Sequence, residues 1–187
     1  MMKRDRRKSY IPLFSSYVVI LALVLIYYTA NLSVIGLAVP LLMVLTPVLL
    51  HSRIHVDITL KDSAKAVIIS YLFLIPFIFT VLVTGGEFSL PGPSTLAFHL
   101  FVASIPEEVY FRGFLQEKAG NTLWGVVITS LAFTVMHSPR YFIGGDVSAL
   151  LTFFPSLVMG WLYMKKRNLL YPVIFHFLSN ILIASIL

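Results

Sequence analysis

Long apolar runs, separated by short polar or turn-forming segments, dominate the chain and define its expected elements. Several of these runs reach the roughly 20 apolar residues that a helix needs to cross a bilayer. No alternating apolar–polar pattern typical of β-strands competes with them. The pattern therefore predicts an all-α, polytopic helical membrane protein. We expect about seven transmembrane helices, over residues 11–29, 33–50, 66–84, 95–116, 122–138, 147–164 and 169–187.

Polar and turn-forming residues bound these expected spans. Asn31 to Ser33 indicates a tight turn, and residues 51–65 indicate a polar loop. Pro139 has no N–H to donate within a helix, so we expect the fifth helix to end just before it. Residues 165–168 close the sixth span. No internal repeat or low-complexity tract interrupts the chain, and we expect a single membrane domain over residues 1–187.

The composition strengthens the membrane assignment. The chain is 58% hydrophobic and 12% charged, whereas soluble domains carry about 25% charged residues. The net charge is +6, but the basic residues cluster at the ends of apolar segments, as expected for contact with anionic lipid headgroups. No basic stripe with interleaved aromatic residues is present, so we expect no nucleic-acid partner. The absence of cysteine excludes disulfides and thiolate chemistry.

The distribution of Lys and Arg predicts an orientation. With the N-terminus in the cytoplasm, the loops at 51–65, 117–121 and 165–168 are also cytoplasmic and, with the N-terminal tail, hold nearly every Lys and Arg. The opposite loops hold only Arg140. This asymmetry follows the positive-inside rule and predicts a protein of the cytoplasmic membrane with its N-terminus inside. The first apolar stretch is longer than that of a signal peptide and lacks a cleavage motif, so we expect it to be retained.

Three ionisable residues interrupt the fourth span. Glu107, Glu108 and Arg112 fall within six residues of an apolar segment, although a charge at the bilayer centre costs at least about 2.5–3.5 kcal/mol on insertion scales. Glu108 and Arg112 are four residues apart and can pair on one helix face. Glu107 is rotated by about 100° from Glu108. An ion pair therefore explains two of the three residues and leaves the Glu107 carboxylate free for chemistry or transport.

Two later spans carry polar residues at helical spacing. Phe133 and His137 are four apart in the fifth span, and His176 and Asn180 are four apart in the seventh. Taken alone, a histidine in the position of His137 is more often an interfacial or packed histidine than a catalytic one. The His176–Asn180 pair alone fits interhelical hydrogen bonding as well as a functional site.

Together these three segments resemble the family of CAAX prenyl endopeptidases and bacteriocin-processing enzymes, which are glutamate-type intramembrane proteases. The family pattern combines a Glu-Glu-x-x-x-Arg, a Phe-x-x-x-His and a His-x-x-x-Asn motif on successive groups of transmembrane helices. The chain matches them in this order at residues 107–112, 133–137 and 176–180. Each motif alone is weak, but all three in order on separate spans are specific. The resemblance covers about residues 95–185.

The resemblance implies roles for the matched residues. Glu107 would be the general base that activates a water molecule, helped by His137. His176 and Asn180 would stabilise the oxyanion of the tetrahedral intermediate. The chemistry is reasonable, because a carboxylate in an apolar setting can accept a proton near neutral pH. No position of the motifs is substituted, and the resemblance implies no cofactor.

The same resemblance gives Glu108 and Arg112 a supporting role that holds the site together. It divides the chain into residues 11–94, which carry spans without a motif, and residues 95–187, which form the catalytic core. The active site would then lie buried among the C-terminal four helices. The implied partners are the lipid bilayer and a membrane-associated peptide or protein substrate.

Three other interpretations remain open. Two Glu and two His residues could bind zinc, although no His-Glu-x-x-His helix is present. Intramembrane Glu, His and Arg residues are equally expected in a proton-coupled transporter, although transporters usually show inverted repeats that this chain lacks. A non-catalytic immunity or chaperone protein is the third. For a protease, we expect cleavage near the membrane in a C-terminal tail or small peptide, and a chain this short favours a substrate without a prenyl group.

Overall fold

Each apolar run of the sequence forms helix in the computed structural model, which describes residues 11–30 and 32–186. Within these residues, the one strand-like pairing is an isolated antiparallel bridge between Phe88 and Ile186. The all-helical fold class is therefore confirmed. The helices are α1 (Ile11–Ala30), α2 (Ser33–Leu49), α3 (Leu60–Val83), α4 (Pro93–Ala97), η2 (Phe98–Ser104), α5 (Ile105–Glu108), η3 (Val109–Gln116), α6 (Glu117–Ala119), α7 (Leu123–Gly144), α8 (Ser148–Leu151), α9 (Phe153–Lys166) and α10 (Leu170–Ala184).

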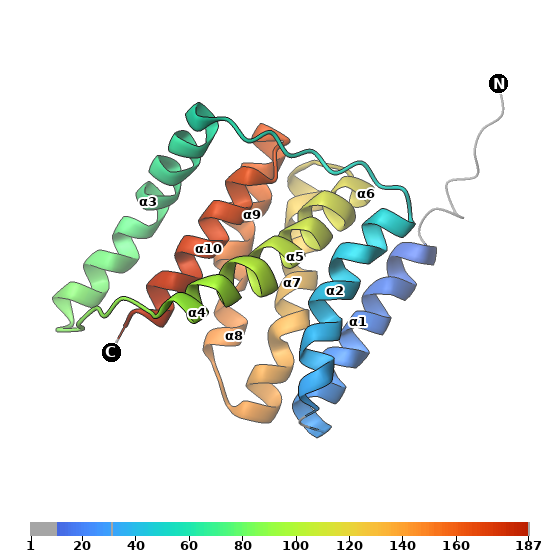
Figure 1. Ribbon diagram of the computed structural model, residues 1–187, viewed down its shortest axis with the longest axis horizontal. Helices are drawn as coiled ribbons and strands as arrows, with labels where there is room; N and C mark the ends of the chain where they lie inside the picture. Colours follow the sequence, from blue (N-terminus) through green and yellow to red (C-terminus); the bar gives the residue numbers. More distant parts are fainter. Residues whose placement is uncertain (1–10, 31, 187) are drawn as a thin grey trace.

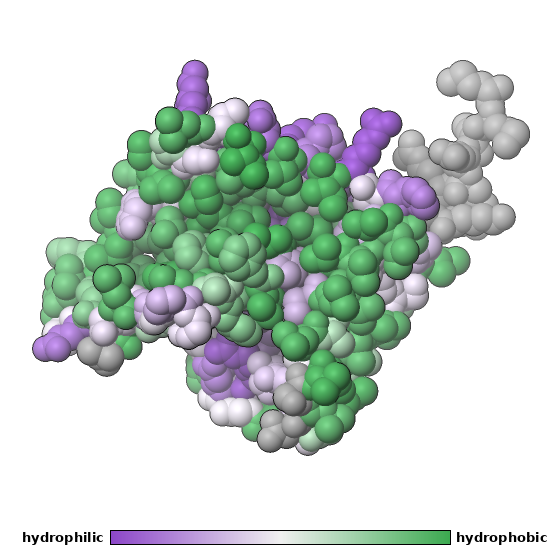
Figure 2. Space-filling view, in the orientation of Figure 1, coloured by the Kyte–Doolittle hydropathy of each residue, from purple (hydrophilic) through white to green (hydrophobic). Residues whose placement is uncertain are grey.

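Two of these helices are long and apolar enough to cross a membrane by themselves. They are α1, with 20 residues, and α3, with 24 residues. The other expected spans correspond to helices that are shorter, less apolar or built from several pieces. The outer surface supports a lipid-facing environment, because apolar side chains cover most of the visible face (Figure 2). The count of seven spans stays a prediction.

The helical stretch from α4 to α6 lies at the centre of the bundle (Figure 1). Its second π-helical segment, η3, is buried at all eight positions and packs against α2, α7 and α9. Helices α1 and α2 pack side by side, α9 lies between α7 and α10, and α3 covers α10 from the outside (Figure 1). Aromatic side chains of η3, α7 and α10 fill the core between them: Tyr110, Phe111, Phe114, Phe133 and Phe175.

Three polar connections meet at one end of the bundle. The backbone N–H of Leu169 donates to the carbonyl of His55, at 3.0 Å. The Asn168 amide donates to the carbonyl of Asp57, at 2.8 Å. Arg167 pairs with Glu117 at 3.6 Å. The basic loops therefore lie together, as the positive-inside argument requires. The basic residues 3–8 lie outside the described residues, and the cytoplasmic position of this end stays a prediction.

The expectation that Pro139 ends the fifth helix is wrong. Helix α7 continues for five residues beyond it, to Gly144. In a regular helix, the N–H of residue 139 would bond to the carbonyl of Val135. The Ser138 hydroxyl donates to that same carbonyl, at 2.8 Å, and replaces the missing bond. Gly145 follows the last helical residue, and its N–H still donates to the carbonyl of Tyr141, while its φ of +70° turns the chain out of the helix.

Two other boundaries also differ from expectation. Helix α3 begins at Leu60 rather than 66, because the Thr59 hydroxyl caps it by accepting from the N–H of Asp62 at 3.0 Å. The expected sixth span is broken at Thr152 into α8 and α9. Pro155, in the first turn of α9, has no N–H for the carbonyl of Leu151, which favours a new helix start at this point.

Candidate active site

Adjacent carboxylates on one helical turn face different surroundings. Glu107 and Glu108 lie on the short helix α5, which joins the π-helical segments η2 and η3. The Glu108 side chain is fully buried, whereas that of Glu107 is 18% exposed. π-Helical turns are rare and occur frequently at functional sites, because they change which face of the helix a side chain occupies. Here the two glutamates are directed to separate networks.

Glu108 is held in a buried network of charged and polar groups. Its Oε2 lies 3.2 Å from Nε of Arg112, as the spacing of four residues predicted, and both side chains are 0% exposed. The Arg112 guanidinium also donates to the carbonyl and hydroxyl of Ser156 on α9, at 3.2 and 3.0 Å. Oε1 of Glu108 lies 2.9 Å from Nδ1 of His176 on α10. The Glu108 carboxylate thus connects α5 with η3 and α10, and Arg112 extends the network to α9.

The Phe133 ring packs against three functional candidates at once. It stacks on the His137 ring, with centroids 4.4 Å apart and planes at 27°. The His176 ring meets it edge-on at 5.8 Å. The Arg112 guanidinium lies over it, 5.0 Å from the ring centroid. A buried aromatic face can stabilise a cation through its quadrupole. Phe133 therefore links the buried ion pair to both imidazoles.

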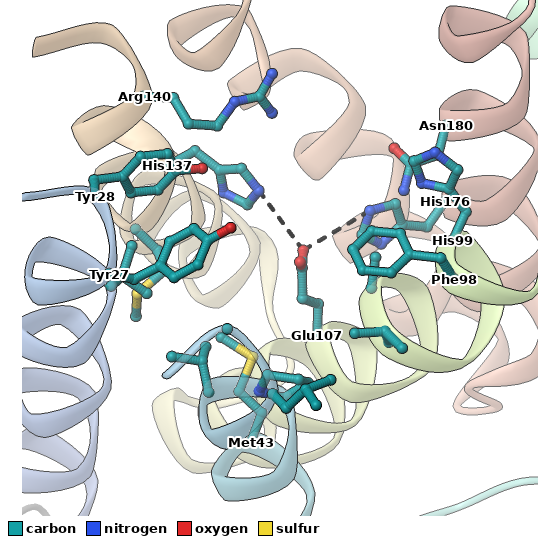
Figure 3. A pocket seen from close by; sticks show the side chains of 18 residues that line it. Tyr27, Tyr28, Met43, Phe98, His99, Glu107, His137, Arg140, His176 and Asn180 are labelled. Carbon is teal, nitrogen blue, oxygen red and sulfur yellow. Dashed lines mark ion pairs between the residues drawn. The ribbon is translucent and has the colours of Figure 1, made fainter. Parts of the chain in front are cut away.

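Glu107 lies between the two imidazoles (Figure 3). Its Oε2 is 3.8 Å from Nε2 of His137 and 3.8 Å from Nε2 of His176. These separations exceed the length of a direct hydrogen bond. Nδ1 of His137 lies 2.9 Å from the Phe133 carbonyl, an acceptor, so Nδ1 carries a proton. The neutral imidazole then presents the Nε2 lone pair to Glu107.

A cavity of about 450 Å³ opens beside the Glu107 carboxylate. Its wall includes four of the residues singled out in the sequence, Glu107, His137, His176 and Asn180. Asn180 lies one helical turn after His176 on α10. Glu108 and Arg112 are absent from the wall, because their side chains are turned into the protein. All six candidates therefore converge on one region, divided between the cavity and its support.

The cavity wall also contains polar residues that the sequence did not single out. His99 on η2 and Arg140 on α7 both line it (Figure 3). His99 lies near a chain connection, where a histidine alone does not indicate a functional site. Its spacing from Ala103 and Glu107, with a step of four residues from each to the next, is the sequence signal for it, since all three residues line the cavity. For Arg140, the sequence predicts only a charge in a loop.

Arg140 is held at the cavity by an acidic partner. Its guanidinium pairs with Asp146, in the connection between α7 and α8. A hydrogen bond from the Ser148 hydroxyl, together with the nearby Arg140, holds the pKa of Asp146 below its ordinary value. Asp146 is therefore ionised at neutral pH, and its negative charge holds the Arg140 guanidinium beside the cavity.

Among residues 11–30 and 32–186, no group of three or more His, Asp or Glu residues has the arrangement of a metal site.

Comparison with family models supports the motif assignment. A model described as type II CAAX prenyl endopeptidase Rce1-like matches residues 89–182, just over half of the 187-residue chain. The matched range contains all six candidate residues and both π-helical segments. Neither the search of curated proteins nor the search of solved structures finds a match.

The packing of Phe133 generates a stability prediction. Phe133→Leu keeps an apolar side chain but removes the ring beneath Arg112 and His137. We expect a loss of roughly 1–3 kcal/mol in the free energy of unfolding, from the lost aromatic and cation–π contacts. Thermal unfolding of the purified protein in detergent measures it. Phe142→Leu is the control, because Phe142 is on the same helix and 77% exposed; equal effects of the two substitutions would contradict the assignment.

Proposed function

Because the chain belongs to the type II CAAX prenyl endopeptidase Rce1-like family, we propose that it is an intramembrane endopeptidase in which Glu107 activates the attacking water. One observation carries this proposal. Oε2 of Glu107 lies 3.8 Å from Nε2 of both His137 and His176, at the wall of a cavity of about 450 Å³. The neighbouring Glu108 is already neutralised by Arg112, which leaves Glu107 as the available base.

In this proposal Glu107 and His137 bind the reacting water together. Both present acceptors to the space between them, because Nδ1–H of His137 is directed to the Phe133 carbonyl. A water that donates one hydrogen to each keeps a lone pair free for attack on a peptide carbonyl. The new C–O bond forms as the water proton moves to the Glu107 carboxylate. General-base assistance of this kind contributes roughly 10²–10⁴-fold to a rate.

In this proposal His176 and Asn180, which both line the cavity, stabilise the oxyanion. The Glu108 carboxylate holds Nδ1 of His176, and we propose that His176 acts as an imidazolium whose Nε2–H donates to the oxyanion. The Asn180 amide supplies a second donor from the next turn of α10. A preorganised donor of this type is worth about 2.7–4 kcal/mol in a dry site. When the tetrahedral intermediate collapses, the C–N bond breaks and the proton on Glu107 moves to the leaving amine.

Glu108 and Arg112 act through the residues that they position. Breaking a buried ion pair by removing one partner costs about 3–5 kcal/mol, because the other charge is left uncompensated. The pair holds His176 through Glu108 and reaches α9 through Ser156. We propose a metal-independent reaction on a C-terminal tail or small peptide close to the membrane, with the lipid bilayer as the surrounding medium.

Glu107→Gln tests the proposed base. The amide cannot accept the water proton, so we expect proteolysis to fall by roughly 10²–10⁴-fold. The measurement is a mass-spectrometric comparison of the termini of membrane and secreted proteins from cells that produce either form. Glu87→Gln is the matched control, because Glu87 is exposed in the connection between α3 and α4.

The same comparison separates the competing functions. Termini that change with Glu107→Gln and not with Glu87→Gln support the protease. If no terminus differs between the wild-type and Glu107→Gln cells, the protease proposal is wrong. An immunity or chaperone function would survive Glu107→Gln, and a proton-coupled carrier would lose transport without any change in protein termini.

Chelation tests the metal-independent part of the proposal. We expect membranes treated exhaustively with a zinc chelator to cleave the substrate identified by the comparison of termini at an unchanged rate, because the Glu107 carboxylate itself activates the water. The rate is measured before and after chelation, and again after zinc is restored. A chelator-induced loss that added Zn²⁺ reverses would establish zinc catalysis instead.

A further inference from the structure

The cavity lies at one end of the helices that form it. Tyr28 lies in the last turn of α1, and Leu37 lies near the start of α2. His99 is near the beginning of the α4–η2 stretch, whereas Arg140 and Asn180 lie near the ends of α7 and α10. All five of these helix ends point the same way, because the chain alternates direction between neighbouring helices. In Figure 1 they lie along the lower side of the bundle, from the α4 label near the C-terminus to the lower ends of α7, α2 and α1.

Positive charge gathers at the opposite end of the bundle. Hydrophilic side chains project from the upper edge in Figure 2, over the connections that meet there. The contacts Leu169–His55 and Arg167–Glu117 hold these connections together. Apart from the buried Arg112 and the cavity residue Arg140, the lysines and arginines in the described part of the chain lie at this end: Arg53, Lys61, Lys65, Lys118, Lys165, Lys166 and Arg167.

A membrane protein with this charge asymmetry keeps its basic end in the cytoplasm, because Lys and Arg in short loops are retained on that side during insertion. The cavity then lies toward the opposite membrane face. We propose that the site receives its substrate from the non-cytoplasmic side of the membrane. The substrate is therefore a peptide segment that has already been exported, or one that emerges from the outer leaflet. The access route follows from charge and cavity position alone, whereas the assignment of that substrate rests on the proposed protease function.

The absence of cysteine from the sequence makes this proposal directly testable. Single cysteines are introduced at matched exposed aliphatic positions, with Val147→Cys at the cavity end and Ile58→Cys at the basic end. These side chains are 60% and 74% exposed. Spheroplasts that produce each full-length variant are treated with a charged, membrane-impermeant maleimide before and after permeabilisation. Denatured samples of each variant report the total labelling.

A second pair of variants probes the cavity itself. Ala103 lines the cavity between His99 and Glu107. Phe101 lies on the same π-helical segment, is 65% exposed and is absent from the cavity wall. We expect a charged reagent to reach Ala103→Cys through the cavity and not to reach Phe101→Cys through lipid.

We expect intact spheroplasts to label Val147→Cys and Ala103→Cys, to label Ile58→Cys only after permeabilisation, and to leave Phe101→Cys unlabelled. Labelling of Ile58→Cys in intact spheroplasts, or of both loop positions to the same extent, would overturn the orientation. Labelling of Ala103→Cys only after permeabilisation, or under neither condition, would overturn access from the outer side.

The result is independent of the protease activity. Each cysteine is introduced into both the wild-type chain and the Glu107→Gln chain, and we expect the same labelling in the two. A protein that labels as expected but changes no termini would refute the proposed function and leave the access route intact. A protease whose cavity is labelled only from the cytoplasmic side would refute the access route and leave the proposed function intact.

Discussion

The Glu108–Arg112 ion pair lies at the centre of the helix bundle with no exposed surface on either side chain. Transfer of each ion from water into a protein interior costs several kcal/mol, and the attraction between the two offsets this cost only when further hydrogen bonds satisfy both groups. Ser156 and His176 supply a hydrogen-bond partner for each ion, and the Phe133 ring adds a cation–π contact, whereas Nη1 of Arg112 has no hydrogen-bond partner among the described residues. Since Ser156, His176 and Phe133 come from α9, α10 and α7, the burial of one ion pair brings three helices together.

This constraint also explains why two adjacent glutamates have different roles. Glu108 is committed to Arg112 and His176, so its carboxylate has little freedom to react. Glu107 lies on the other face of the same turn and lines a cavity. There its Oε2 is 3.8 Å from Nε2 of each of two imidazoles. The network around Glu108 thereby holds the His176 ring that faces Glu107. Rigid support for a few reacting groups is the general requirement of a preorganised site.

Local sequence rules predicted the helices and the pairing of Glu108 with Arg112, but not several details of either. The apolar runs and the four-residue spacings identified the helical stretches and the pairing of Glu108 with Arg112. Where α7 continues past Pro139, the Ser138 hydroxyl donates to the carbonyl that the proline leaves without its helical partner, a contact that the proline rule does not consider. Five further residues of helix bring Arg140 to the cavity. The contact between Arg112 and Ser156 joins residues 44 apart, and no local pattern marks a serine for that position.

The central claim is that Glu108 is structural and Glu107 is free to react. Thermal unfolding of the purified Glu107→Gln and Glu108→Gln proteins in the same detergent tests it most directly. The two residues are adjacent, and each substitution makes the same change, from a carboxylate to an amide of nearly equal size. The account predicts that Glu108→Gln lowers the Tm by on the order of 10 °C, since Arg112 is left buried beside a neutral amide, and that Glu107→Gln changes it far less. A loss of stability for Glu107→Gln equal to or greater than that for Glu108→Gln would contradict the account.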